Sequence, residues 1–98
     1  MTPMAEPRFI TADWPAPASV RACVTTRAGG VSRAPYASFN LAAHVGDDPQ
    51  AVGANRARLR AELALPGEPA WLTQVHGVAV VDAAQATDLP QADGVFAT

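Results

Sequence analysis

The alternation of apolar and polar residues predicts several short strands along the chain. Residues 20–26 are rich in β-branched side chains and alternate approximately, which is typical of a strand that ends at Gly29-Gly30. Alternation would place Cys23 on the opposite face from Val24, and we interpret Cys23 as a small buried apolar residue. Shorter strands are expected at 9–11, 71–75, 78–83 and 95–97.

A helical period is clearest in the middle of the chain. Val52, Leu59 and Leu63 recur at helical spacing, after Asp47 or Asp48 as N-cap and Pro49 in the first turn. The sequence therefore predicts a helix over about 49–63 that is stopped by the Leu-Pro-Gly of 65–67. The expected fold is α+β: a mixed sheet that carries this helix on one face.

Composition narrows the class of protein. The 98 residues are 49% hydrophobic and 16% charged, as in soluble globular proteins. The net charge of -2 gives neither a basic stripe for nucleic acid nor a polybasic patch for lipid. No apolar run reaches the length of a signal peptide or a membrane span, so a cytoplasmic location is expected. Residues 1–7 hold two prolines and few apolar groups, and we expect them to be disordered.

The lone Cys23 can form no internal disulfide and supplies too few thiols for a structural zinc site. The clustered cations Arg56, Arg58 and Arg60, with Glu62 close by, are first interpreted as a solvated helix face. Two aromatic residues, Trp14 and Trp71, are expected in the core.

Two histidines are candidates for chemistry. His76 follows an apolar strand and precedes a glycine, where a neutral imidazole could bind zinc or copper. The alternative is a histidine satisfied by hydrogen bonds at a strand end, which spacing alone favours. His44 could bind an anion or substrate, or stabilise the loop before the helix. The two histidines lie too far apart to form a metal-spacing motif.

Arg27 precedes Ala28-Gly29-Gly30, and an arginine beside glycine-rich backbone can bind phosphate through paired donors and loop N–H groups. The alternative is a turn whose arginine points to solvent. The Gly-x-x-x-x-Gly-Lys spacing of a P-loop is absent. Asp93 is expected to start a turn, and it could also orient a loop near a site.

Three ordered blocks and a fourth short one together resemble one family. They are Thr-Thr-Arg-Ala-Gly-Gly-Val-Ser at 25–32, the segment 35–48 followed by Asn55-Arg56, Trp-Leu-Thr-Gln-Val-His-Gly at 71–77, and Ala-Asp-Gly at 92–94. Their order and spacing agree from Trp14 to Thr98 with the YfiH-like group, also described as polyphenol oxidase or laccase-domain proteins. Members of that group are single-domain α+β proteins well over twice this length, so the resemblance makes residues 1–98 the N-terminal portion of one such domain.

The resemblance implies phosphorolysis of adenosine, inosine and methylthioadenosine, with adenosine deamination as a second reaction. It implies one zinc ion held by two histidines and a cysteine, and an older description gives copper and phenol oxidation. His76 matches the first metal histidine, Arg27 matches an arginine on the substrate side that would bind phosphate, and three residues match positions near the pocket: Asn40, His44 and Arg56.

The chain departs from the family in two respects. The second and third ligands, in an Ala-Asp-Cys block and a His-Ala-Gly block, have no counterpart, and Cys23 lies in the wrong place to substitute. We therefore expect this chain to be inactive alone. The alternatives are a copper oxidase, a non-catalytic remnant that binds its missing part or itself, and a binding module that lacks the metal.

Overall fold

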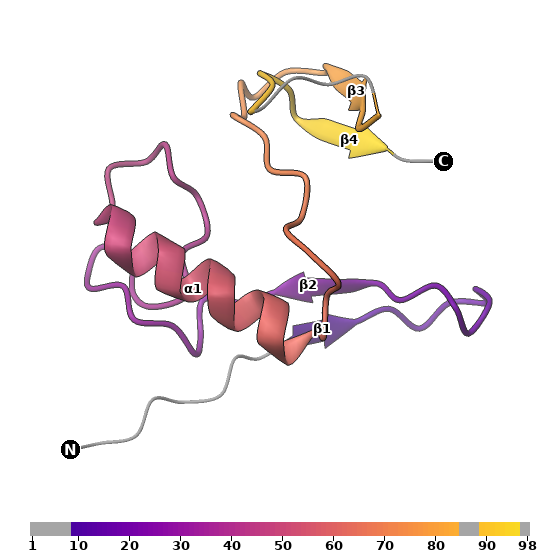
Figure 1. Ribbon diagram of the computed structural model, residues 1–98, viewed down its shortest axis with the longest axis horizontal. Helices are drawn as coiled ribbons and strands as arrows, with labels where there is room; N and C mark the ends of the chain where they lie inside the picture. Colours follow the sequence, from indigo (N-terminus) through magenta and orange to yellow (C-terminus); the bar gives the residue numbers. More distant parts are fainter. Residues whose placement is uncertain (1–8, 85–88, 97–98) are drawn as a thin grey trace. The chain divides into compact units, whose positions relative to one another are not determined.

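The computed structural model describes residues 9–84 and 89–96. The chain divides into two compact units, residues 1–64 and residues 65–98. Each unit holds a two-stranded sheet, and the first also holds the helix (Figure 1). The expected α+β class is confirmed. The expected mixed sheet is instead two separate pairs, one antiparallel and one parallel. The expected disorder of residues 1–7 lies outside the described residues.

In the first unit, β1 (Phe9–Thr11) pairs antiparallel with β2 (Cys23–Thr25), with Ile10 opposite Val24. The predicted strand at 20–26 is therefore shortened at both ends. Cys23 is exposed, as are Ile10 and Val24, so the prediction of a buried thiol is wrong. The physical reason is that a pair of three-residue strands has little covering for either face.

Trp14 lies in the connection between β1 and β2, which Figure 1 shows extending away from the helix. Its side chain is 53% exposed, so the prediction that Trp14 belongs to the core is also wrong. Pro15 and Pro17 bend this connection into a turn, and an aromatic residue at an exposed turn has few neighbours to pack against.

Helix α1 (Pro49–Glu62) confirms the prediction to within one residue. The Asp48 carboxylate caps the helix by accepting a hydrogen bond from the Gln50 nitrogen at 3.0 Å, and Pro49 occupies the first turn. The helix ends at the C-cap Leu63, before the expected stop, because Ala64 takes a left-handed conformation with φ 51°. Within the described residues, no helix is long and apolar enough to span a membrane.

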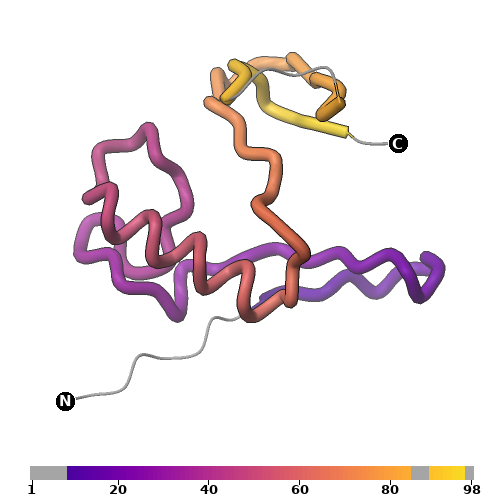
Figure 2. The backbone as a smooth tube through the Cα atoms, viewed as in Figure 1, coloured from indigo at the N-terminus to yellow at the C-terminus, as the bar shows by residue number. Residues whose placement is uncertain are grey.

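The core of the first unit lies between α1 and the long loop, which we define as residues 26–48. Val52 and Leu59 of the helix are 3% and 6% exposed, and Phe39 of the loop is 4% exposed. Phe39 also meets Phe9 of β1 edge to face, with ring centroids 6.5 Å apart. Figure 2 shows the long loop winding beside the helix. The predicted packing of the helix on a sheet face is thus replaced by packing against a loop.

The arginines of α1 are less solvated than predicted. Arg56, Arg58 and Arg60 are all half-buried. Arg58 forms an ion pair with Glu62 one turn later, with 3.8 Å between nitrogen and oxygen. The interpretation as a solvated helix face therefore holds only in part, because long arginine stems can cover apolar surface while their charged ends stay near water or polar partners.

In the second unit, β3 (Val80–Asp82) pairs parallel with β4 (Gly94–Phe96), with Val81 opposite Val95. The predicted strands at 78–83 and 95–97 match β3 and β4 to within two residues at each end. Residue 97 of the second prediction lies outside the described residues. The predicted strand at 71–75 is reduced to one bridge between Thr73 and Gln91.

The reason for the shorter pairing is a turn at residues 75–77, which leaves the extended conformation at His76. Beside the bridge, Ala92 is fully buried. Trp71 is half-buried, and its indole N–H donates to the Glu68 carboxylate at 2.8 Å.

Candidate functional site

The backbone at Arg27 is fixed by hydrogen bonds across the long loop. The Arg27 carbonyl accepts from the backbone nitrogens of Ser38 and Phe39, both at 2.9 Å, and from the Ser38 hydroxyl at 3.0 Å. Arg27 itself is exposed. The structure thus presents an exposed arginine on a main chain that three hydrogen bonds hold in place.

Gly30 packs against the same part of the loop. Its nitrogen donates to the Ser38 hydroxyl at 3.1 Å. A Cβ at position 30 would lie 2.6 Å from Asn55 Oδ1 and from Phe39 Cα, and closer still to the Ser38 carbonyl oxygen. These are main-chain and buried atoms that have little room to move, so a glycine is required here for lack of space.

Asn55 connects α1 to the long loop and is 1% exposed. Its Oδ1 accepts from the Val31 nitrogen at 2.9 Å, and its Nδ2 donates to Ser32 Oγ and to the Asn40 carbonyl, both at 2.8 Å. One buried side chain therefore satisfies three polar groups of the loop.

Asn40 and Asp47 extend this network. Asn40 Nδ2 donates to the Ala42 carbonyl at 3.1 Å and to Asp47 Oδ2 at 3.2 Å, and Asn40 Oδ1 accepts from the Ala42 nitrogen at 3.1 Å. Ser32 Oγ donates to Asp47 Oδ2 at 2.6 Å. The Ser32 hydroxyl is the main cause that lowers the pKa of Asp47, and hydrogen bonds from Asn40 and the Asp48 nitrogen act in the same direction against desolvation.

His44 and Arg56 both lie near this network, His44 on the long loop and Arg56 on α1. His44 is exposed, in a segment that Tyr36 fixes by donating from its hydroxyl to the Val45 carbonyl at 2.6 Å. Arg56 Nε donates to the Leu41 carbonyl at 2.9 Å, and burial lowers the pKa of its guanidinium. The structure therefore brings Asn40, Arg56 and the Arg27 backbone into one helix–loop assembly, with His44 exposed on the same loop.

His76 occupies a turn of the second unit, which we call the histidine turn (residues 75–77). His76 is exposed and has φ 56°, a left-handed conformation uncommon for residues other than glycine. The Asp93 carboxylate accepts from three consecutive backbone nitrogens: Oδ1 from Val75 at 3.0 Å and from His76 at 2.7 Å, and Oδ2 from Gly77 at 2.7 Å.

Beside the expected role at a turn, Asp93 could orient a loop, and these hydrogen bonds show that it holds the histidine turn. The Asp93 nitrogen also donates to the Ala79 carbonyl at 2.9 Å, so Asp93 is itself held in place. The Gly77 N–H is the main cause that lowers the pKa of Asp93, and the His76 and Val75 amides and the His76 charge add to it while desolvation opposes it.

The fit to a metal can be tested on the donor set. Within residues 9–84 and 89–96, no three His, Cys, Asp or Glu residues lie together in a way that could hold a metal ion. His76 fits one ligand position, because it is an exposed imidazole on a fixed turn. The described residues therefore do not by themselves form a complete set of three metal ligands.

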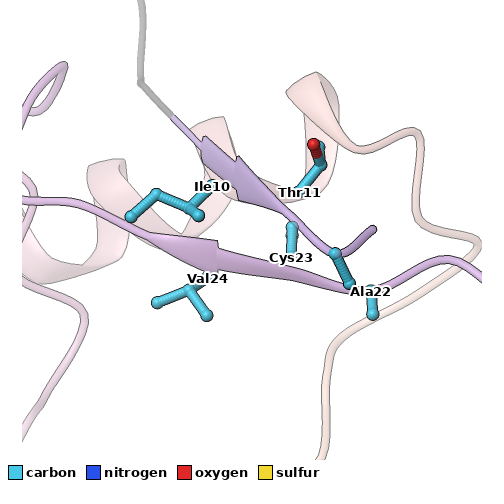
Figure 3. A pocket seen from close by; sticks show the side chains of 6 residues that line it. Ile10, Thr11, Ala22, Cys23 and Val24 are labelled. Atoms are coloured by element: carbon cyan, nitrogen blue, oxygen red, sulfur yellow. The ribbon is translucent and has the colours of Figure 1, made fainter. Parts of the chain in front are cut away.

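A hollow of about 190 Å³ lies at the strand pair of the first unit. Figure 3 shows that both β1 and β2 contribute to its walls. It is lined by Ile10, Thr11, Ala12, Ala22, Cys23 and Val24. None of the site residues predicted from the sequence lines it.

The role of three residues in ordering the long loop was not predicted from the sequence: Ser32, Asp47 and above all Asn55. A signal for Asn55 was present in the helical period. Position 55 follows Val52 by three residues and precedes Leu59 by four, so it shares their buried face. A polar residue on an apolar face needs partners, and the asparagine could have been assigned to the loop on that ground.

Comparison with known proteins identifies relatives of this chain. A family model described as multi-copper polyphenol oxidoreductase laccase matches residues 21–98. The chain is 64% identical over 75 residues to purine nucleoside phosphorylase PA4543 of Pseudomonas aeruginosa, which covers 76% of this chain and 30% of that protein. It is 54% identical over 70 residues to purine nucleoside phosphorylase YfiH of Escherichia coli, covering 71% and 29%.

Two solved structures are also similar to this chain in fold and sequence. Protein NMB0706 of Neisseria meningitidis superposes with a TM-score of 0.76 at 51% identity, over 87% of this chain and 35% of that one. YlmD from Geobacillus stearothermophilus superposes with a TM-score of 0.68 at 35% identity, over 92% and 41%. The chain thus spans about a third of the length of these proteins. The long match and these identities show that the chain belongs to the multi-copper polyphenol oxidoreductase laccase family, whose YfiH-type members are named purine nucleoside phosphorylases.

Proposed function

We propose that this chain contributes one part of the site of a purine nucleoside phosphorylase and that Arg27 binds the phosphate. The observation that carries the proposal is the exposed guanidinium of Arg27 on a main chain fixed by three hydrogen bonds, beside Gly29-Gly30. A fixed arginine offsets the charge of phosphate and orients it with paired donors. The names of the relatives support the reaction class.

In phosphorolysis, a phosphate oxygen forms a bond to the ribose carbon while the bond from that carbon to the purine nitrogen breaks. The electron pair of the broken bond leaves with the purine, which takes up a proton. Arg27 would hold the phosphate dianion on the side from which it attacks. The nucleosides we propose are adenosine, inosine and methylthioadenosine.

Three further residues are proposed on the substrate side. His44 is exposed on the long loop and can donate or accept a hydrogen bond toward a nucleoside. The side chains of Asn40 and Arg56 donate hydrogen bonds to the backbone carbonyls of Ala42 and Leu41 in the long loop. They therefore shape the segment that presents His44.

His76 is proposed as one ligand of a zinc ion, with copper as the alternative metal. Bound zinc would supply a water of lowered pKa, suited to the deamination of adenosine that we propose as a second reaction. The contribution of this chain is an imidazole on a fixed turn, and the remaining ligands lie elsewhere. We accordingly expect the 98-residue chain to be inactive by itself.

The test uses a chimera in which this chain replaces the matching segment of the Pseudomonas relative. We expect phosphate-dependent release of purine from inosine by the chimera and none by the 98-residue chain alone. Arg27→Ala should raise the apparent KM for phosphate at least tenfold. Arg33→Ala, an exposed arginine on the same loop, is the matched control and should leave that KM unchanged. An unchanged phosphate dependence in Arg27→Ala would remove Arg27 from the proposal.

A second candidate function rests on the description of the matching family model, which names a polyphenol oxidoreductase. It predicts oxygen uptake with a phenol that requires copper and is lost in His76→Ala. Purine release without such oxygen uptake, from the same chimera, would eliminate it.

A further inference from the structure

Asp93 is separated from the histidine turn by sixteen to eighteen residues in sequence, yet its carboxylate binds all three amides of that turn. Both oxygens take part, with distances between 2.7 and 3.0 Å. A carboxylate is well suited to this role because it accepts only, and it can serve several N–H donors at once.

The turn has a conformation that needs such support. A residue other than glycine is destabilised in the left-handed region of backbone conformation. It keeps this conformation where the surrounding structure imposes it. At His76 the contacts that impose it are the hydrogen bonds to Asp93. The backbone angle at His76 sets the direction in which its Cα–Cβ bond, and thus its imidazole, leaves the chain.

Asp93 is also fixed on its own side. Its nitrogen and that of Gly94 donate to the Ala79 carbonyl, at 2.9 and 3.2 Å, and Gly94 opens β4. The carboxylate is thus tied to the strand pair of the second unit, and the strand pair fixes the turn through it.

We propose that Asp93 is the positioning residue of His76: it acts through the backbone of the histidine turn to aim the imidazole at the metal. This proposal rests on the proposed function, in which His76 is a metal ligand. It assigns Asp93 no contact with metal or substrate. A carboxylate that orients a ligand in this indirect way affects metal affinity more than substrate binding.

The first arm of the test uses the 98-residue chain. Asp93→Asn keeps one acceptor oxygen but turns an NH2 group toward the amides, whereas Asp93→Ala removes every acceptor. We expect hydrogen exchange at the amides of residues 75–77 to accelerate in the order native, Asn, Ala. The scalar coupling between the amide and Hα protons of His76 should show that its φ leaves the left-handed region.

The matched control is Asp82→Asn. Asp82 lies in the same unit, and its carboxylate likewise accepts from a backbone nitrogen, that of Ala84 at 3.0 Å. This partner lies outside the histidine turn, so exchange at residues 75–77 should stay as in the native chain. Equal exchange in Asp93→Asn, Asp93→Ala and the native chain would overturn the proposal.

The second arm titrates the chimera with Zn²⁺ alone. We expect Asp93→Asn to weaken zinc binding about tenfold or more, with the KM for inosine unchanged, whereas Asp82→Asn leaves both unchanged. Zinc binding that is equal in native and Asp93→Asn chimeras overturns the positioning role but leaves the proposed function intact. A native chimera that binds no zinc at all overturns the metal part of the proposed function, and this proposal with it.

Discussion

Asn55 Oδ1 lies 2.9 Å from the Val31 nitrogen and accepts its hydrogen bond, which joins the middle of α1 to the start of the long loop. The same side chain donates to Ser32 and Asn40, so the loop that presents Arg27 and His44 depends on one buried amide.

Removal of that amide should be costly. We expect Asn55→Ala to lower the free energy of unfolding by about 3 kcal/mol, because it leaves buried polar groups of the loop without partners. Denaturant unfolding followed by the helix signal in circular dichroism measures this loss. Gln50→Ala, at an exposed position of the same helix, is the control and should change stability by less than about 0.5 kcal/mol. A loss as small in Asn55→Ala would contradict the role given to the amide.

Substitution by alanine should have opposite effects on stability at Gly30 and at Gly53. Gly30→Ala places a methyl group against the Ser38 carbonyl and Asn55, and should destabilise the chain by about 3 kcal/mol or more. Gly53 lies exposed in α1, and beyond the helix's own backbone and the neighbouring residues an added Cβ would meet no atom within 4 Å, so Gly53→Ala should stabilise by about 1 kcal/mol. The two midpoints of urea unfolding should therefore move in opposite directions, and a shared direction would refute the packing described at Gly30.

A substitution at the C-terminal end of α1 should increase the stability of the chain. Ala64 has φ 51°, and glycine takes this conformation without the steric cost that a Cβ brings. Ala64→Gly should therefore raise the free energy of unfolding by about 1 kcal/mol. Ala57→Gly, at an exposed position inside the helix, should lower it by about 1 kcal/mol. Thermal unfolding of both variants checks the pair, and destabilisation by Ala64→Gly would show that the helix does not end in a left-handed residue.

The carboxylates of Asp47 and Asp93 should make the free energy of unfolding depend on pH in the acidic range. The pKa values of Asp47 and Asp93 lie below 3.8, the ordinary value for aspartate, because hydroxyl and amide N–H donors stabilise the charged forms. A lowered folded-state pKa adds stability above the unfolded-state value, and this stability is lost as pH falls through the folded-state pKa. Unfolding midpoints should thus fall steeply below about pH 4. The decline should flatten in Asp47→Asn and in Asp93→Asn, and most in the double variant; an equally steep decline in the double variant would argue against both assignments.

The helix could be predicted because its signals are local. Asp48, Pro49 and the spacing of Val52 and Leu59 act within a few residues, and the observed bounds follow them. The strands were placed within a few residues but their lengths were overestimated. Strand length depends on pairing with distant segments, and among the described residues each sheet holds two strands.

The candidate site was predictable in part for the same reason. The positions of Arg27, His44 and His76 on turns or loops follow from neighbouring glycines and turn residues. Burial at Cys23 and Trp14 depends on what covers them, and alternation does not supply that information. The partners of Asn55 and the left-handed angle at His76 arise from contacts 15 to 24 residues away, which no local pattern encodes.

The hydrogen bonds of Asn55 also have a consequence for the order of folding. Their partners are 24, 23 and 15 residues away along the chain. The conformational entropy of the closed loop is therefore lost before each hydrogen bond can stabilise the structure. Because all three share one side chain, closing one loop brings the other two partners near. The helix–loop assembly should therefore form in a single late step, after α1 and β2, and Asn55→Ala should speed unfolding of the first unit more than it slows folding.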